Sequence, residues 1–176
     1  MKYATKDKKI NIINGSVFTN IRDIVQAGNN GSTVIVPHVC NNINSFGAGF
    51  ALALAKEYPL VKENYHMLGP VFLKNNLGYT QFVEVLKDNQ YGHKLIFANM
   101  IAQNGTISKN NPRPLNYLAL IKSMISINSY IKKNIPDTPV QIHAPKFGSG
   151  LAGGNWNLIK ELIQDIWDVP VFIYQI

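Results

Sequence analysis

Two stretches of this chain decide its fold: PHVCNNINSFGAGFA at 37–51 and PKFGSGLAGGNW at 145–156. Each follows a run of apolar and β-branched residues, at 33–39 and 140–145, that is typical of a buried strand. Each then leads into a segment with the composition of a helix. A strand, a short glycine loop and a helix in succession predict a βα unit whose loop lies at the carboxyl end of its strand.

The segments outside these two stretches continue the same alternation. For the first helix, Thr19 or Asn20 suits the N-cap position, and GNNG at 28–31 suits its end. Alternating strands and helices, with several continuously apolar strands, predict an α/β fold of three α/β/α layers. The other strands are expected at 9–17, 71–73, 79–85, 94–101 and 169–176, and the helices at 19–29, 50–58, 60–67, 115–134 and 156–167.

Length and composition indicate one domain over residues 1–176, with 1–9 as a flexible basic N-terminus. There is no apolar run of the length that crosses a membrane, and 1–9 lacks the apolar stretch of a signal peptide. The single cysteine, Cys40, cannot form an intramolecular disulfide. We therefore expect a cytoplasmic monomer without membrane contact.

The formal net charge of +7 raises nucleic acid as an alternative partner. The basic residues are scattered, and Arg22 and Arg113 are the only arginines in the sequence. Arginine is the side chain best suited to base edges and to bidentate phosphate contacts. A small phosphorylated ligand is therefore the preferred interpretation of the charge, and RNA binding is a minor alternative.

The glycine loops suggest what that ligand contacts. Backbone with few side chains can approach phosphate oxygens closely, and its N–H groups form an anion-binding nest. Neither loop contains the Gly-Lys-Ser/Thr of a Walker A sequence, and Gly148, Gly150 and Gly153 match G-x-G-x-x-G in spacing only. Two loops could hold a diphosphate between them. The alternative is that both are plain strand-to-helix turns.

The segments 37–51 and 145–156 resemble the two ligand loops of macrodomains, the Appr-1″-p processing family. IFANMIAQ at 96–103 and VFIYQI at 171–176 also fit, so the resemblance runs from about Ile10 to Ile176. It is nearest to the branch of ADP-ribose 1″-phosphate phosphatases and terminal ADP-ribose glycohydrolases. The resemblance implies a central mixed sheet flanked by helices and a site for ADP-ribose or ADP-ribose 1″-phosphate. No cluster of His, Cys and Asp has the spacing of metal ligands, so we expect no metal, and we expect no cofactor.

The same resemblance implies the site residues. Asn41 matches the asparagine of the distal ribose, and Tyr174 matches the aromatic residue that stacks on adenine, with Phe172 as the alternative. Ser16 stands where the family often has an adenine-binding Asp, so that carboxylate is missing. The full set expected to bind ligand is Gly15, Ser16, Asn41, Gly47, Ala48, Gly49, Phe50, Phe147, Gly148, Ser149, Gly150, Leu151 and Tyr174.

Catalysis is the open question. Ala51, Gln103 and Ala152 stand where hydrolytic relatives have an Asp, a Lys and an Asp, so removal of ADP-ribose from protein lacks its usual groups. His38 lies at a strand end beside the first loop and is expected to titrate near neutral pH as an acid or base. The alternative is a structural histidine at the strand end whose ring is hydrogen-bonded to backbone. His38 with Asn41 forms the expected catalytic pair.

The remaining candidates have structural interpretations. His143 is expected to be structural, and Cys40 is expected to be a small buried strand residue.

The leading hypothesis is a phosphatase that converts ADP-ribose 1″-phosphate to ADP-ribose. A non-catalytic ADP-ribose reader and a weak ADP-ribosyl hydrolase are the alternatives within the family.

Overall fold

A single sheet organises the fold in the computed structural model, which describes residues 10–26, 32–87 and 94–176. Within these residues the sheet has six strands in the order β1-β6-β5-β2-β4-β3. Neighbouring strands run parallel, except that β3 is antiparallel to β4, so the sheet is mixed as expected. The strands are β1 (Asn11–Asn14), β2 (Thr33–Asn41), β3 (Thr80–Lys87), β4 (Lys94–Gln103), β5 (Val140–Pro145) and β6 (Val171–Gln175).

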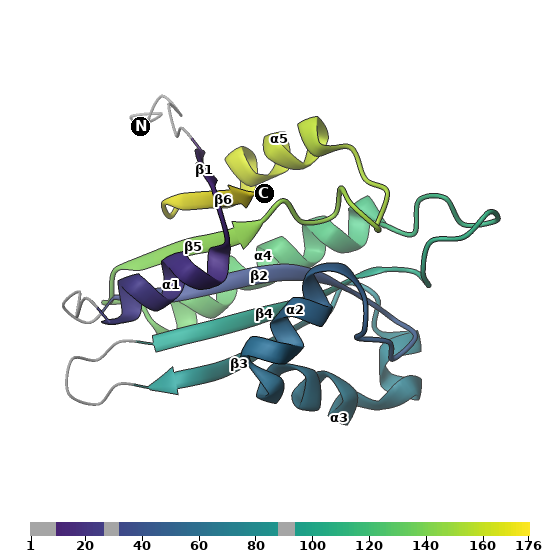
Figure 1. Cartoon of the computed structure of the whole chain (residues 1–176), viewed down its shortest axis with the longest axis horizontal. Helices are drawn as coiled ribbons and strands as arrows, with labels where there is room; N and C mark the ends of the chain where they lie inside the picture. Colours follow the sequence, from purple (N-terminus) through teal and green to yellow (C-terminus); the bar gives the residue numbers. More distant parts are fainter. Residues whose placement is uncertain (1–9, 27–31, 88–93) are drawn as a thin grey trace.

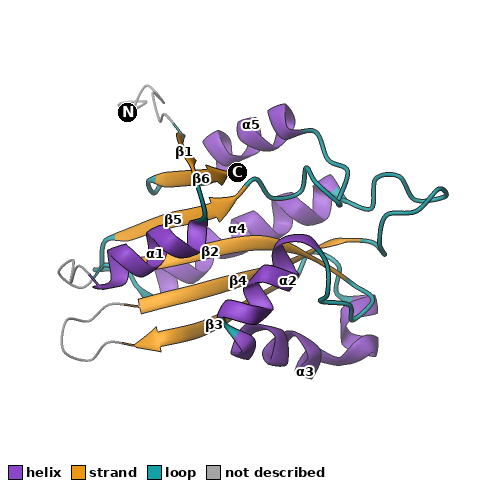
Figure 2. Cartoon of the chain, viewed as in Figure 1, coloured by secondary structure: helices purple, strands orange, loops and turns teal. Residues whose placement is uncertain are grey.

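Helices cover both faces of this sheet, which confirms the three-layer α/β/α architecture (Figures 1 and 2). The helices α1, α2 and α3 pack with one face, and α4 and α5 pack with the other. No helix within the described residues is long and apolar enough to cross a membrane. The helices are α1 (Val17–Gln26), α2 (Gly49–Glu57), α3 (Pro59–Asn75), α4 (Tyr117–Asn134) and α5 (Trp156–Ile166).

Strand β2 shows why the sheet needs two helical layers. Its side chains alternate between faces: Val34 and Val36 are buried with α1–α3, and Ile35 is buried with α4 and α5. A strand that is apolar on both faces must be covered on both. Because β2, β5 and β6 are parallel neighbours, their carboxyl ends lie at the same edge, on the right in Figure 1.

Two local predictions were wrong. The segment 71–73, expected as a strand, is the last part of α3, where Leu73 is buried and Val71 is 73% exposed. Three apolar residues fit either element, and here only one of them packs inward. The first helix begins at Val17 and not after Thr19 or Asn20, since the Ser16 hydroxyl accepts a hydrogen bond from the Phe18 N–H. Residues 1–9 and 28–31 lie outside the described residues.

Buried histidines join neighbouring strands on the α1–α3 side of the sheet. On β2, His38 Nε2 lies 2.5 Å from Asn99 Oδ1 on β4, and Asn99 donates in turn to Gln81 on β3. On β5, His143 Nδ1 lies 2.7 Å from the Tyr174 hydroxyl on β6. Burial lowers the pKa of His38 and of His143 to about 4. The expectation of a structural His143 agrees with these contacts.

We expect the free energy of unfolding to fall as the pH is lowered from about 6.5 towards 4. In this window the unfolded chain binds protons at His38 and His143 that the folded chain does not, so stability rises with pH. The full shift corresponds to roughly 3 kcal/mol for each histidine. Urea unfolding at pH 7 and pH 4.5 measures the loss. His143→Gln should show a smaller loss than the unmodified chain, and an equal loss would contradict the assignment.

Candidate functional site

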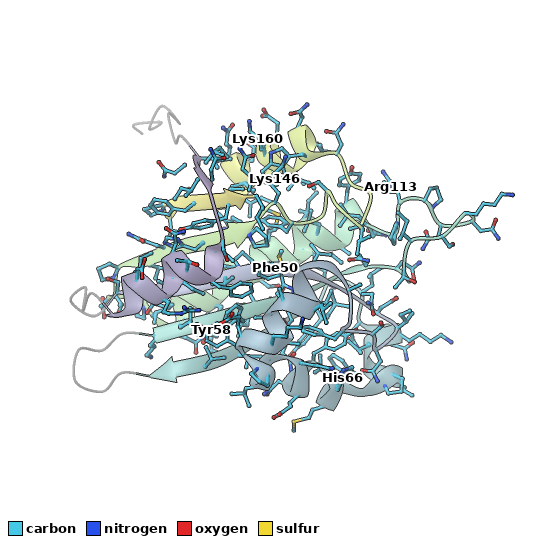
Figure 3. All side chains as sticks on the ribbon, viewed as in Figure 1. Phe50, Tyr58, His66, Arg113, Lys146 and Lys160 are labelled. Atoms are coloured by element: carbon cyan, nitrogen blue, oxygen red, sulfur yellow. The ribbon has the colours of Figure 1, made fainter. Side chains whose placement is uncertain are left out.

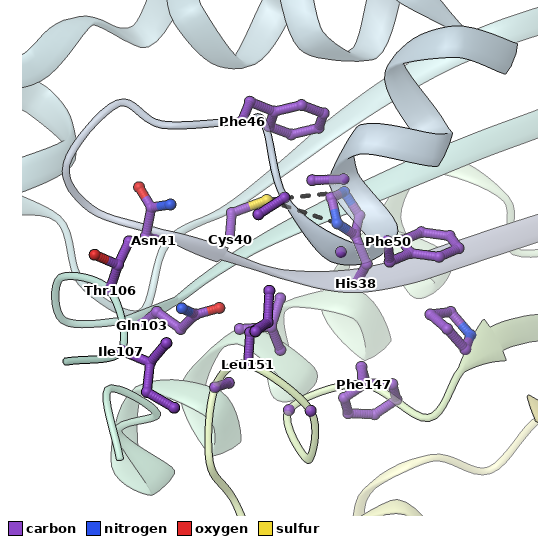
Figure 4. A pocket seen from close by; sticks show the side chains of 18 of the residues that line it. His38, Cys40, Asn41, Phe46, Phe50, Gln103, Thr106, Ile107, Phe147 and Leu151 are labelled. Atoms are coloured by element: carbon purple, nitrogen blue, oxygen red, sulfur yellow. Dashed lines mark hydrogen bonds between the residues drawn. The ribbon is translucent and has the colours of Figure 1, made fainter. Parts of the chain in front are cut away.

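The main cavity lies at the carboxyl ends of β2, β4 and β5 and has a volume of about 490 Å³ (Figure 4). It is bounded by the loops that follow these three strands. The structure therefore joins the two glycine loops, 100 residues apart in the sequence, at one site. The cavity brings together the expected catalytic residue His38 and nine of the residues expected to bind ligand: Asn41, Gly47, Ala48, Gly49, Phe50, Phe147, Gly148, Gly150 and Leu151.

Four expected residues do not line this cavity: Gly15, Ser16, Ser149 and Tyr174. The Ser16 hydroxyl caps α1, and the Ser149 hydroxyl donates to the Lys146 carbonyl. The ring of Tyr174 is 4% exposed and its hydroxyl is bonded to His143, so no face of it is offered to a ligand in this conformation. Of the phenylalanines that line the cavity, Phe46 and Phe147 are buried and Phe50 is half-buried.

The first loop ends in a helix whose first N–H groups are unpaired. Ala48 occupies the N-cap position of α2 and provides no side-chain hydrogen bond. The first amide of the helix to find an acceptor is that of Leu52, bonded to the Ala48 carbonyl. The N–H groups of Gly49, Phe50 and Ala51 are therefore left for a ligand or solvent. All three residues line the cavity.

The second loop also carries unpaired N–H groups. Its turns are closed by hydrogen bonds from Phe147 to Pro145, from Gly153 to Gly150 and from Gly154 to Gly148. Between them, the N–H groups of residues 148–152 have no acceptor within the described part of the chain. The two loops approach closely, since a Cβ atom at Gly49 would lie 3.2 Å from Leu151 Cδ1. Unpaired donors therefore come from both loops.

The charges around the cavity favour an anion. The lining residues include no Asp or Glu, and they include one permanent cation, Lys146. Unpaired backbone N–H groups attract an anion, and there is no carboxylate in the lining to repel it. Within the described residues, no three side chains of His, Cys, Asp or Glu gather closely enough to hold a metal ion.

Most hydrogen-bonding groups of the Asn41 side chain are used to hold the first loop, and few remain for the cavity. Its Oδ1 accepts from the N–H groups of Ile43 and Ser45 and from the Tyr65 hydroxyl, at 2.9–3.2 Å. Its Nδ2 donates to the Ser45 carbonyl at 2.7 Å. Only one amide hydrogen of Asn41 remains for a ligand. The structure therefore gives Asn41 a loop-organising role that the sequence did not reveal.

A third loop, after β4, completes the wall. Asn42 donates to Asn104 Oδ1 and accepts from the Gly105 N–H, which ties this loop to the first. The tie brings Thr106 and Ile107 into the lining, as Figure 4 shows. No pattern in the sequence marks these two residues beyond their position after a buried strand, where ligand contacts concentrate.

His38 lines the cavity in a different state from the one expected. It is 1% exposed, and the rings of Phe46 and Phe50 pack against its ring at centroid distances of 5.7 and 5.5 Å. Because burial lowers its pKa to about 4, the prediction that it titrates near neutral pH is wrong. With this pKa the ring is neutral at pH 7 and cannot act as an imidazolium acid there, although the bond between its Nε2 and Asn99 partly opposes the shift. Cys40 is buried beside it, and burial raises the pKa of this thiol.

No family model matches the chain. An uncharacterized 17.5 kDa protein of Enterobacteria phage T4, from the tk-vs intergenic region, is 25% identical over 137 residues. That match covers 73% of this chain and 76% of the phage protein. A Bacteroides thetaiotaomicron protein of unknown function is 26% identical in structure-based comparison, with a TM-score of 0.75, and the match covers 97% of this chain and 99% of that one.

Other solved structures identify the fold. A macrodomain protein from Streptomyces coelicolor is 25% identical with a TM-score of 0.65, and the match covers 96% of this chain and 99% of that one. DarTG from Thermosipho africanus, solved in complex with ADP-ribose, is 16% identical with a TM-score of 0.66. That match covers 96% of this chain and 42% of DarTG. The chain therefore has the macrodomain fold.

Tyr65→Phe tests how the first loop is held. The Tyr65 hydroxyl lies 2.9 Å from both the carbonyl oxygen and Oδ1 of Asn41, and its ring is fully buried. We expect the variant to fold with a loss of about 1 kcal/mol and with faster hydrogen exchange at the amides of Ile43 and Ser45. Tyr79→Phe, at an exposed position, is the control. Unchanged exchange at these two amides would show that the hydroxyl does not organise the loop.

Proposed function

We propose that this chain binds ADP-ribose in the main cavity, with the diphosphate between the loops that follow β2 and β5. One observation carries the proposal: unpaired backbone N–H groups from both loops meet at a cavity whose lining has no carboxylate. Such groups bind phosphate oxygens well, because their positive partial charges are fixed in place before the ligand arrives.

The size and lining of the cavity agree with this ligand. A volume of about 490 Å³ lies in the range of roughly 300–1,000 Å³ that is usual for small-ligand pockets. Phe50 offers an aromatic ring on which adenine could stack, and Phe18 supports that ring from behind at a centroid distance of 5.2 Å. The ADP-ribose complex of Thermosipho africanus DarTG supports the same ligand by likeness of fold.

Hydrolysis of ADP-ribose 1″-phosphate is the second candidate function. It is favoured by the absence of carboxylates among the lining residues, because a cavity without them can accept the extra charge of a terminal phosphate. Release of ADP-ribose from a protein ester is less favoured. Ala51, Gln103 and Ala152 all line the cavity and supply neither an acid nor a nucleophile.

We expect ADP-ribose to bind with a dissociation constant in the micromolar range, roughly −8 kcal/mol. AMP should bind at least about tenfold more weakly, because its single phosphate cannot engage both loops. Isothermal titration calorimetry with the two ligands measures the difference. Equal affinities would rule out a diphosphate site that spans both loops.

Gly150→Glu provides the matched variant for that titration. A Cβ atom at Gly150 meets no atom within 4 Å, so the new side chain enters open space at the cavity and should not unfold the chain. It adds negative charge beside the unpaired N–H groups, and ADP-ribose binding should be lost. Met67→Glu places the same charge on the exposed surface of α3 and should bind normally. If a folded Gly150→Glu variant binds ADP-ribose normally, the ligand does not bind beside Gly150.

For the second candidate, we expect phosphate release from ADP-ribose 1″-phosphate to be insensitive to protonation of His38 between pH 6 and 8. The reason is that a group with a pKa of about 4 does not change charge in this range. A malachite green assay across this pH range measures the profile. A rate that tracks a group with a pKa near 7 in the unmodified chain, and no longer does so in His38→Gln, would contradict the electrostatics of His38. No release at any pH would leave ADP-ribose binding as the function.

A further inference from the structure

We infer that Lys146 binds the ligand diphosphate through its ammonium group, and that Trp156 holds the side chain in position for this contact. The inference rests on the proposed function, because it assigns a residue to the ADP-ribose site. Nothing in the sequence analysis marked Lys146, since a lone lysine in a basic chain carries no pattern of its own.

Lys146 stands at the start of the second loop. It follows the last residue of β5, Pro145, and precedes the backbone of 148–152 whose N–H groups are unpaired. It lines the cavity together with Gly148 and Gly150. Its side chain is exposed, and Figure 3 shows it beside α5 near the carboxyl edge of the sheet. An ammonium group there is near the donors that we propose hold the phosphates.

Trp156 limits where this ammonium can lie. Lys146 Nζ is 5.4 Å from the centroid of the Trp156 ring, within the range of a cation–π contact. The ring is itself fixed, because Phe147 packs edge-on against it and Asn155, the N-cap of α5, bonds through its N–H to the Tyr117 hydroxyl. A cation–π contact orients a lysine without neutralising its charge. The ammonium therefore keeps its full charge for an anion.

No acidic side chain competes for that charge. Lys146 forms no ion pair within the described residues. The three loop segments around the cavity, 41–50, 103–117 and 145–156, contain no Asp or Glu. Arg113 lies over Tyr117 at 4.7 Å, and it does not line the cavity. Lys146 is thus a cation of the cavity wall without an acidic partner. A phosphate oxygen can form a charge-assisted hydrogen bond with its ammonium group.

The proposal distinguishes the diphosphate from a terminal phosphate. Lys146 belongs to the same loop as the unpaired N–H groups of 148–152, which we propose contact the diphosphate. If the ammonium joins that contact, its removal should weaken ADP-ribose and ADP-ribose 1″-phosphate by the same factor. If it served the terminal phosphate, only the second ligand would be weakened.

The experiment is a calorimetric titration of both ligands into the unmodified chain and into Lys146→Met, Lys146→Arg and Trp156→Leu. Methionine keeps an apolar stem of similar length and removes the charge. We expect Lys146→Met to weaken both ligands about tenfold, Trp156→Leu to weaken them about threefold, and Lys146→Arg to stay within about threefold of the unmodified chain. Lys160→Met, a lysine on α5 that does not line the cavity, is the control and should change neither affinity.

The salt dependence of the affinity separates a lost charge from a packing defect, because a packing defect would leave this dependence unchanged. The affinity of the unmodified chain should fall between 50 and 300 mM NaCl, and that of Lys146→Met should fall less. A Lys146→Met variant with unchanged affinity and salt dependence would overturn the inference and leave the proposed function standing. A loss confined to ADP-ribose 1″-phosphate would overturn the diphosphate assignment. If the unmodified chain binds neither ligand, both proposals fail.

Discussion

Unpaired backbone N–H groups at the carboxyl edge of the sheet are the feature on which the proposed site depends. They meet at one site because β2 and β5 are parallel neighbours, so the loops that leave these strands start at the same edge. One loop enters α2 without a side-chain cap, and the other turns through 148–152 without internal acceptors. Gly49, Gly150 and Leu151 are exposed, so solvent can serve the donors there in the free chain. An anion placed between the two loops would satisfy both sets at once.

The side chains around these loops act mainly on the backbone. Asn41 holds the first loop through Ile43, Ser45 and Tyr65, and Asn42 ties that loop to the one after β4. In this arrangement the amide side chains shape the site, and we propose that the backbone together with Lys146 contacts the ligand. The arrangement is well suited to binding, since its donors are held in place beforehand. It provides fewer groups for proton transfer, because the lining lacks carboxylates and burial keeps His38 neutral at pH 7.

Much of the fold could be predicted from the sequence, because β-branched runs and glycine loops are local signals. The strands around 33–41, 94–103 and 140–145 and both glycine loops were found in this way. What failed depended on partners far away in the chain. His38 is neutral because burial under side chains from several elements lowers its pKa, and the bond to Asn99, 61 residues later, only partly opposes this effect. The contact between the Tyr174 hydroxyl and His143 depends on the pairing of β5 with β6, which periodicity alone does not decide.

The account is tested most directly by following the backbone amides of the chain by two-dimensional NMR as ADP-ribose is added. It predicts that the largest shifts fall on the amides of 49–51 and 148–152, the groups that lack acceptors in the free chain. It also predicts that these amides become protected from hydrogen exchange when the ligand saturates the site. Shifts confined to another surface, or unchanged exchange at both loops in a saturated sample, would contradict the claim that their backbone holds the diphosphate.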